Sequence, residues 1–353
     1  MDLVNAKNSD DKKLKSKKVE SMSFDEVKAI ILQNDSKKLR EIIAEKNLDI
    51  NMKARGGREN LITVACKAGF IECVQVLLDY NITIHADEHS DPLDAASSRG
   101  HVDIVKLLLN LNKEGRIAKE RLKNALISAT GAGYLVVVQL LVSYGVDSDS
   151  LNAGLYVAAE ANQLEVAAFF LDHKADANAA SDDLYSAITI ACNEGHHDML
   201  RLLLSRGADP NGVDGDGISP LCVALYNPKL LTVLFEYGAD PNLRFADEST
   251  ALLDVVQSED GNVEILSTLL ENHANPNLAV IDTGDTALFL AALDNNMGYV
   301  KVLLEHGADV TQANHKGKTV LTLPSRTRKY AEIIELCTQY IDCNKPGAKL
   351  LLK

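Results

Sequence analysis

Residues 202–211 read LLLSRGADPN, and this stretch decides the fold because close copies of it recur along the chain. Residues 234–242 read LFEYGADPN, residues 269–277 read LLENHANPN, and residues 303–310 read LLEHGADV. If the glycine slot of the phrase serves as the marker, weaker copies complete a series at Asn81, Asn112, Gly145, Lys174, Gly207, Gly238, His273 and Gly307. Its intervals are 31, 33, 29, 33, 31, 35 and 34 residues. Such regular spacing predicts a linear array of stacked repeats.

An upstream half of the unit recurs at a fixed distance from this phrase. Residues 91–101 read DPLDAASSRGH and residues 219–224 read SPLCVA. Over about residues 24–342 the sequence resembles the ankyrin-repeat family, whose unit carries T-P-L-H-x-A-A-x-x-G-H. The histidine of the fourth slot is replaced in every copy, by Thr63, Asp94, Ile127, Tyr156, Thr189, Cys222, Leu253 and Phe289. The resemblance implies an all-α ankyrin-repeat solenoid of helix-turn-helix units with projecting β-hairpin loops, about nine to ten repeats including caps.

The residue types of the repeat unit explain its local structure. An acidic or hydroxyl residue before proline, as in Asp91-Pro92, caps a first helix with proline at its first position. A second helix begins after Gly100-His101, and its apolar residues recur at helical spacing. A glycine such as Gly207 ends that helix in the left-handed conformation, and the following Asp-Pro-Asn starts a hairpin. The copies over 114–178 diverge, so we expect irregular helix lengths or hairpins there.

The repeat pattern also divides the chain. Residues 1–20 carry Lys12, Lys13, Lys15, Lys17 and Lys18 and predict a disordered arm. Repeats need polar caps at both ends because a single repeat cannot bury its own apolar faces. We therefore expect the following parts: capping helices at 21–51, ankyrin repeats at 52–311, a closing repeat at 312–342 and a flexible tail at 343–353.

Composition bounds the class of protein. The chain has 353 residues, 46% of them hydrophobic, no Trp and six Cys without metal-ligand spacing. No stretch approaches about 18 uninterrupted apolar residues, so we expect no membrane insertion and an intracellular, cytoplasmic monomer. The net charge of −14 argues against nucleic acid as a partner. The run Lys12–Lys18 could be a nuclear-import signal or a contact to an anionic surface, but a solvated flexible arm is the favoured interpretation.

Three groups could suggest chemistry, and none predicts an active site. The run Gly212–Gly217 lacks the Lys-Ser/Thr of a P-loop and the closing Glu of an EF-hand. His196, His197 and Asp198 are consecutive, and adjacent helical side chains point about 100° apart, which makes metal binding unfavourable. Cys222 has no acid–base partner in sequence and is expected to pack as a small apolar residue. We expect no enzyme activity, no cofactor and no metal.

The excess charge is concentrated in one part of the chain. Residues 179–285 hold 18 Asp and Glu against 4 Lys and Arg, a local net charge of −14. Many of these acids fall at expected hairpin tips, where their potentials add, so a basic protein partner is predicted. The predicted partner-binding residues are Asp182, Asp183, Tyr185, Asn193, Glu194, Asp214, Asp216, Tyr226, Asp247, Glu248, Asp282 and Asp285.

Aromatic residues are candidate anchors of this surface, because exposed aromatics hold interfaces more often than other types. The set comprises Tyr156, Tyr185, Tyr226 and Phe289, and each could instead belong to the core. Two function classes stay open. The first is a non-catalytic scaffold for protein–protein interaction, which the resemblance implies. The alternative is a targeting or regulatory ankyrin module of a larger enzyme or of a bacterial host-directed effector.

Asparagines at one turn position form a last group. Asn211, Asn242 and Asn277 follow the Asp-Pro or Asn-Pro of three copies. In the ankyrin family such turns can carry asparaginyl hydroxylation. The favoured interpretation is that Asn is chosen here for turn geometry.

Overall fold

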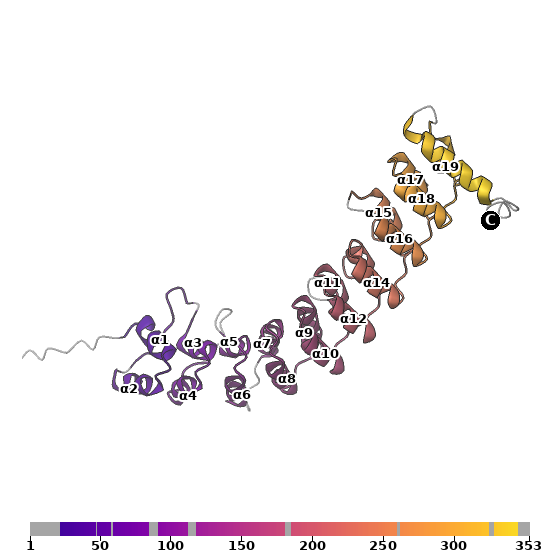
Figure 1. Cartoon of the computed structure of the whole chain (residues 1–353). Coiled ribbons are helices and arrows are strands. Elements are labelled where there is room, and N and C mark those ends of the chain that lie inside the picture. The colour runs from indigo at the N-terminus through magenta and orange to yellow at the C-terminus, as the bar shows by residue number, and fades with distance from the viewer. Residues whose placement is uncertain are drawn as a thin grey trace, which may run out of the picture. The chain divides into compact units, whose positions relative to one another are not determined.

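The structure is a computed structural model that describes residues 22–46, 48–57, 59–84, 91–111, 118–180, 185–259, 262–324 and 328–344. Its described residues are mostly α-helical (Figure 1). The chain divides into two compact units, Met1–Ile117 (unit 1) and Ala118–Lys353 (unit 2). The predicted arm at 1–20 lies outside the described residues, as does all of the predicted tail except its first two positions. The predicted domain limits therefore stay predictions.

In its described residues, unit 1 has six helices, which form two rows. The inner row is α1 (Phe24–Leu32), α3 (Leu61–Ala68) and α5 (Pro92–Ser97), which pack against one another in that order. The outer row is α2 (Ser36–Lys46), α4 (Ile71–Asp79) and α6 (Val102–Leu111). Ser23 and Glu26 form a reciprocal capping box at the start of α1, and Val27 and Ile31 of this helix are fully buried.

Unit 2 continues the same alternation of inner and outer helices. Its inner row is α7 (Lys119–Gly131), α9 (Ser148–Glu160), α11 (Ala187–Asn193), α13 (Pro220–Ala224), α15 (Ala251–Gln257) and α17 (Ala287–Leu293). Its outer row is α8 (Leu135–Ser143), α10 (Leu164–Asp172), α12 (His197–Ser205), α14 (Pro228–Glu236), α16 (Val263–Glu271) and α18 (Met297–Glu305). The 3-10 helix η1 (Val320–Thr322) and α19 (Arg328–Asn344) follow, and both pack against α17. The predicted all-α repeat fold is confirmed.

The ends of the helices form as the sequence predicts. Asp91 and Ser219 accept backbone hydrogen bonds at the starts of α5 and α13, with Pro at the first helical position. The glycine slot is left-handed, with φ of 95° at Gly207 and 68° at Lys174. Asn81, Gly145, Gly238, His273 and Gly307 are also left-handed, and Asn112 lies outside the described residues. The shared feature of this slot is therefore its left-handed backbone conformation, since Gly, Asn, Lys and His all occupy it.

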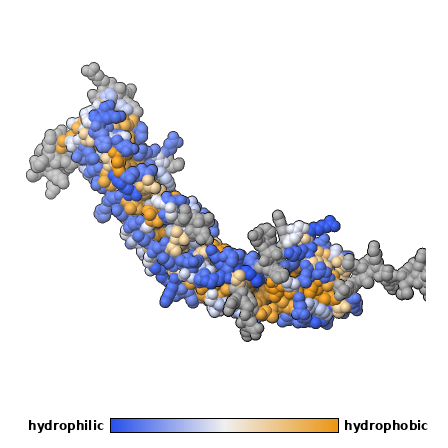
Figure 2. Space-filling view, turned by 180° about the vertical axis from the view of Figure 1, so that it is seen from behind, coloured by the Kyte–Doolittle hydropathy of each residue, from blue (hydrophilic) through white to orange (hydrophobic). Residues whose placement is uncertain are grey.

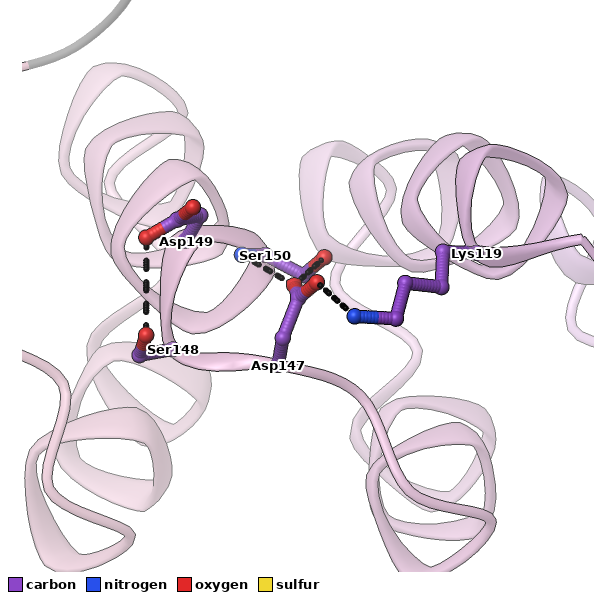
Figure 3. Close-up of polar contacts among 5 residues, drawn as sticks. All are labelled: Lys119, Asp147, Ser148, Asp149 and Ser150. Atoms are coloured by element: carbon purple, nitrogen blue, oxygen red, sulfur yellow. Dashed lines mark hydrogen bonds and ion pairs between the residues drawn. The ribbon is translucent and has the colours of Figure 1, made fainter.

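The divergent copies are irregular, as expected. Helices α7 and α9 each have 13 residues, whereas α11 has 7. Asp147 caps α9 by accepting from the amide and the hydroxyl of Ser150, and Lys119 at the start of α7 lies 3.4 Å from Asp147 (Figure 3). The hydrogen bonds from Ser150 and the charge of Lys119 lower the pKa of Asp147 to about 2. This carboxylate joins two consecutive inner helices.

Hairpins project between most of the other repeats. Four of them are marked by one antiparallel bridge each in the described residues: Lys53 with Asn60, Ala180 with Ser186, Arg244 with Thr250 and Ala279 with Thr286. The second residue of each pair is the N-cap of the next inner helix. The same residue therefore closes the hairpin and caps the next inner helix, so the start of the helix fixes the position of the hairpin.

Candidate functional site

The described part of unit 2 contains a cleft of about 490 Å³ between two hairpins and an inner helix. Asp247, Glu248 and Ser249 come from the hairpin before α15, and Val280, Ile281 and Asp282 come from the next hairpin. Asp254, Gln257 and Ser258 come from α15 and its end, and Tyr226 follows α13. The cleft therefore brings together residues of three consecutive repeats, four of which (Tyr226, Asp247, Glu248 and Asp282) belong to the predicted site.

Acidic and apolar side chains share this cleft. Asp247, Glu248 and Asp282 are exposed, and no ion pair found among the described residues involves them. Tyr226 and Ile281 are 45% and 47% exposed, which is high for such large apolar side chains. No Lys or Arg is among the residues that line the cleft. The cleft can therefore offer negative charge and apolar contact to the same ligand.

Asp254 responds electrostatically to this environment. Burial raises the pKa of Asp254, a hydrogen bond from the Ser249 hydroxyl lowers it, and the nearby charge of Asp247 raises it again. Desolvation has the largest effect, so the net result is a pKa above the usual value. A cation placed in the cleft would favour the ionised form of Asp254.

Most of the few cations of residues 179–285 lie outside the cleft. Arg201 of α12 contacts Glu236 at 2.6 Å, and Arg206 contacts Asp172 at 2.6 Å. Arg244 donates to the backbone carbonyls of Glu248 and Ala279, so it ties one hairpin to the next. The remaining cation, Lys229, is exposed on the outer helix α14. Arg244 therefore lies beside the cleft and offsets part of its negative charge, whereas the other three cations of this segment do not line it.

The other predicted site residues have several different positions. Tyr185 is exposed, as are Asn193, Glu194 and Asp216. Asn193 donates to the carboxylate of Glu194 at 2.9 Å, which orients that side chain at the end of α11. Asp285 accepts from the Asn314 amide at 2.7 Å. Asp182 and Asp183 lie outside the described residues.

Asp214 corrects the expectation of an exposed hairpin tip. Its side chain is 7% exposed, and its Oδ1 accepts from the amides of Asp216 at 3.1 Å and Ile218 at 2.9 Å. The carboxylate therefore points into its own turn because it satisfies backbone donors there, as Asp commonly does. Asp216, two residues later, is the exposed acid of this hairpin.

The aromatic candidates separate by burial. Phe289 is only 6% exposed and packs in the core of α17, so an anchoring role for it is wrong. Tyr156 is half-buried, whereas Tyr185 and Tyr226 are exposed. Only the last two have the accessible ring that an interface anchor needs.

The groups considered for chemistry have structural positions. Burial raises the pKa of the Cys222 thiol, and the charges of Asp254, Asp247 and Asp214 add to the effect, so the nucleophilic thiolate is disfavoured. His196 lies 3.1 Å from the Glu160 carbonyl of the preceding repeat, an interaction between repeats. Within the described residues no group of three His, Cys, Asp or Glu could hold a metal ion, and no helix is long and apolar enough to cross a bilayer.

Sequence reasoning missed several lining residues of the cleft. The residues not predicted are Ser249, Asp254, Val280 and Ile281. Two further lining residues, Gln257 and Ser258, end the inner helix α15. Asp254 stands in the variable slot after the fourth position of the unit, where other copies carry Ala95, Val223 or Leu290. A charged residue in that slot is the signal that could have identified it.

Hydrophilic and hydrophobic side chains are unevenly distributed over the surface. In Figure 2, hydrophilic side chains cover much of the visible face of unit 2, and hydrophobic side chains gather on the visible face of unit 1. Exposed apolar residues of unit 1 include Leu32 and Leu111, at 51% and 53%.

Comparison with known proteins identifies the pattern. The family model described as ankyrin repeats (3 copies) matches residues 27–119, 155–245 and 252–346. The ankyrin repeat domain of Bcl-3, described as a unique member of the IkappaB protein family, is 27% identical, with a TM-score of 0.54 over 60% of this chain and 97% of that one.

Relatives of known sequence are longer proteins. An ankyrin repeat and KH domain-containing protein of Caenorhabditis briggsae is 26% identical over 67% of this chain and 10% of its own length. Human ankyrin repeat and SOCS box protein 6 is 30% identical over 49% of this chain and 43% of its own. Palmitoyltransferase ZDHHC13 of Pongo abelii is 30% identical over 61% and 35%. The chain thus spans less than half the length of each of these relatives.

Proposed function

Because the chain belongs to the ankyrin-repeat family, we propose that it is a non-catalytic scaffold that holds a basic protein partner against the acidic cleft and hairpins of unit 2. Ankyrin repeats mediate protein–protein interaction, and stacked repeats present extended binding surfaces. The observation that carries the proposal is the cleft itself, in which Asp247, Glu248 and Asp282 surround exposed apolar groups.

Electrostatics decides the kind of partner. Carboxylates that lie within a Debye length of one another, about 8 Å at physiological ionic strength, reinforce each other's potential. Such a surface attracts a basic partner and speeds its encounter, while it repels an acidic one. The buried Asp214 contributes to the turn, so the exposed acids Asp216, Asp247, Glu248 and Asp282 are the principal contacts in this proposal. The proposed surface is completed by Tyr185, Asn193, Glu194 and Asp285, while Asp182 and Asp183, which lie outside the described residues, stay contacts predicted from the sequence.

The proposal includes where the protein acts. We infer that the protein is a monomer inside the cell. Entry to the nucleus, directed by Lys12–Lys18, is the alternative location to test. The partner is a protein, and nucleic acid is disfavoured because the net charge is −14.

The test compares captured proteins. The full chain and a variant with Asp216→Asn, Asp247→Asn, Glu248→Gln and Asp282→Asn are immobilised, and retained proteins are identified by mass spectrometry. We expect the full chain to retain proteins with basic surfaces that the variant loses. Glu264→Gln with Glu271→Gln, two exposed acids of the outer helix α16, serves as the control and should retain the same set. Identical sets for all three proteins would contradict the proposal.

A second function is favoured by one observation. The palmitoyltransferase relative has 35% of its length covered, so in that protein the repeats accompany further sequence. In this alternative the repeats serve as a targeting or regulatory module of a larger enzyme or of a bacterial host-directed effector. A full-length transcript that encodes a catalytic domain after Lys353 would support it.

A further inference from the structure

The cleft of unit 2 has features that discriminate between the two basic side chains. Resting on the function proposed above, we propose that it is a seat for one arginine side chain of an extended partner segment, with an aliphatic residue of the same segment against Ile281. The supporting observations are the distribution of carboxylates, the exposed tyrosine ring and the apolar hairpin.

The carboxylates approach the cleft from different elements. Asp247 and Glu248 stand on one hairpin, Asp282 stands on the next, and Asp254 rises from the helix between them. A guanidinium group presents five N–H donors in a plane and can donate to several carboxylates at once. An ammonium group is a compact, strongly hydrated charge that gains less from dispersed acceptors. This distribution therefore favours arginine over lysine.

Tyr226 also favours arginine over lysine. Its side chain is 45% exposed and lines the cleft, so its ring is available to a guest. Guanidinium groups stack on aromatic faces through cation–π and planar contacts. Val280 and Ile281 continue the lining, and Ile281 is 47% exposed. A peptide that carries an aliphatic residue beside its arginine would cover this apolar surface.

The walls of the cleft are fixed by hydrogen bonds. Asp247 accepts from the Ser249 amide at 3.0 Å, and the Ser249 hydroxyl donates to Asp254. Arg244 joins the two hairpins by donating to the carbonyls of Glu248 and Ala279. The Asp282 carbonyl lies 3.0 Å from the ring nitrogen Nδ1 of His315. These bonds hold the backbone of both hairpins and the carboxylates of Asp247 and Asp254 in place before a guest binds, which reduces the ordering cost of binding.

The volume suits this guest. About 490 Å³ lies within the usual range of binding clefts, roughly 300–1,000 Å³, and exceeds what one side chain fills. The cleft lies beside the hairpins, so a segment in extended conformation can run along it and leave one basic side chain inside. This geometry separates the proposal from general attraction of positive charge.

The experiment uses the full chain and a random linear peptide library displayed on phage. Selected peptides are synthesised with each Arg retained or replaced by Lys or by citrulline, which is neutral and nearly isosteric. Their Kd values are measured by fluorescence anisotropy. We expect selected peptides that carry Arg next to an aliphatic residue, about tenfold weaker binding with Lys, and still weaker binding with citrulline.

Variants of the protein locate the seat. Asp247→Asn with Asp282→Asn, and Tyr226→Ala, should each weaken the Arg peptide by about tenfold or more, whereas Tyr226→Phe keeps the ring and should bind normally. The control Glu264→Gln with Glu271→Gln removes the same charge from outer helix α16 and should change Kd by less than about twofold. Circular dichroism verifies that each variant is folded.

The failures are distinguishable. Equal affinity for Arg and Lys peptides would overturn the arginine seat while leaving the basic partner intact. Insensitivity to the Asp247, Asp282 and Tyr226 variants would overturn the cleft as the location. Selection of peptides without basic residues would contradict both this inference and the proposed function.

Discussion

The Oδ1 atom of Asn211 accepts a hydrogen bond from the backbone amide of Asp240 in the next repeat, at 2.7 Å. The Nδ2 atom of the same residue donates to the Gly238 carbonyl at 3.2 Å. Asn178, Asn242 and Asn277 make the same pair of bonds to their following repeats. These four asparagines form a ladder that joins successive repeats of unit 2 through their backbones.

The ladder predicts a stability cost for Asn211→Ala. Loss of two intramolecular hydrogen bonds to backbone groups should lower the free energy of unfolding by about 1–2 kcal/mol. Asn193→Ala is the control, because Asn193 is exposed and contacts only the neighbouring Glu194 in the hydrogen bonds of the described residues. Urea unfolding followed by circular dichroism measures both variants. Equal midpoints would show that the ladder contributes nothing.

The same geometry bears on modification of these asparagines. Both polar side-chain atoms of Asn211 are already bonded to backbone groups of the next repeat, which gives a structural reason for Asn at this position that needs no modification. We expect the peptide that contains Asn211 to have its unmodified mass when the protein is made in a eukaryotic host. A mass increase of one oxygen, measured by mass spectrometry, would show hydroxylation instead.

Asp214 and Asp216 predict opposite outcomes from the same substitution. Asp214→Ala removes the acceptor for two backbone amides in a buried turn and should cost about 1–3 kcal/mol of unfolding free energy. Asp216→Ala changes an exposed side chain and should stay within about 0.5 kcal/mol. Thermal unfolding of both variants tests the assignment, and a larger loss with Asp216→Ala would contradict it.

These two residues also show where sequence reasoning reaches its limit. The repeat phrase places a turn at 209–217, and this was correct, but two acids in one turn look alike in sequence. The backbone turns so that Asp214 faces its own amides and Asp216 faces solvent. Which of the two acids is buried depends on where the backbone N–H donors lie. The spacing of residues in the sequence does not give those positions.

The repeat itself could be predicted in much more detail. The left-handed slot was located even where Lys174 and His273 replace glycine, because the period fixes the position independently of the residue type. The cleft could not be located in this way. It is formed by side chains of three repeats, and whether an aromatic residue faces solvent, as Tyr226 does, or the core, as Phe289 does, depends on packing.

The pKa of Asp254 should respond in opposite directions to two neighbours. Asp247→Asn removes a negative charge and should lower the pKa of Asp254, whereas Ser249→Ala removes a hydrogen bond to the carboxylate and should raise it. Carboxyl carbon chemical shifts followed against pH measure both effects. Because the folded pKa is raised, protonation of Asp254 favours the folded state, so its contribution to stability increases as pH falls through that pKa. Shifts in the same direction for both variants would contradict the account.

The contribution of Asp147 to stability changes with pH in the opposite direction. Its pKa of about 2 lies below the ordinary value, chiefly because the Ser150 hydroxyl and amide donate to it. The ionised carboxylate therefore stabilises the fold above about pH 4, and this contribution is lost as pH falls towards 2. Ser150→Ala should raise the pKa of Asp147 and destabilise the protein at pH 7 more than at pH 2. An unchanged titration of Asp147 would show that Ser150 does not hold it.

The most direct test of the central claim is the association rate of a partner identified by capture or selection, measured by stopped-flow at increasing salt. If the acidic hairpins steer a basic partner, the rate should fall as salt screens the field, and Asp216→Asn, Asp247→Asn and Asp282→Asn should each slow association. Tyr226→Ala should act mainly on the dissociation rate. A partner whose association is independent of salt and of all three Asp changes would contradict the claim.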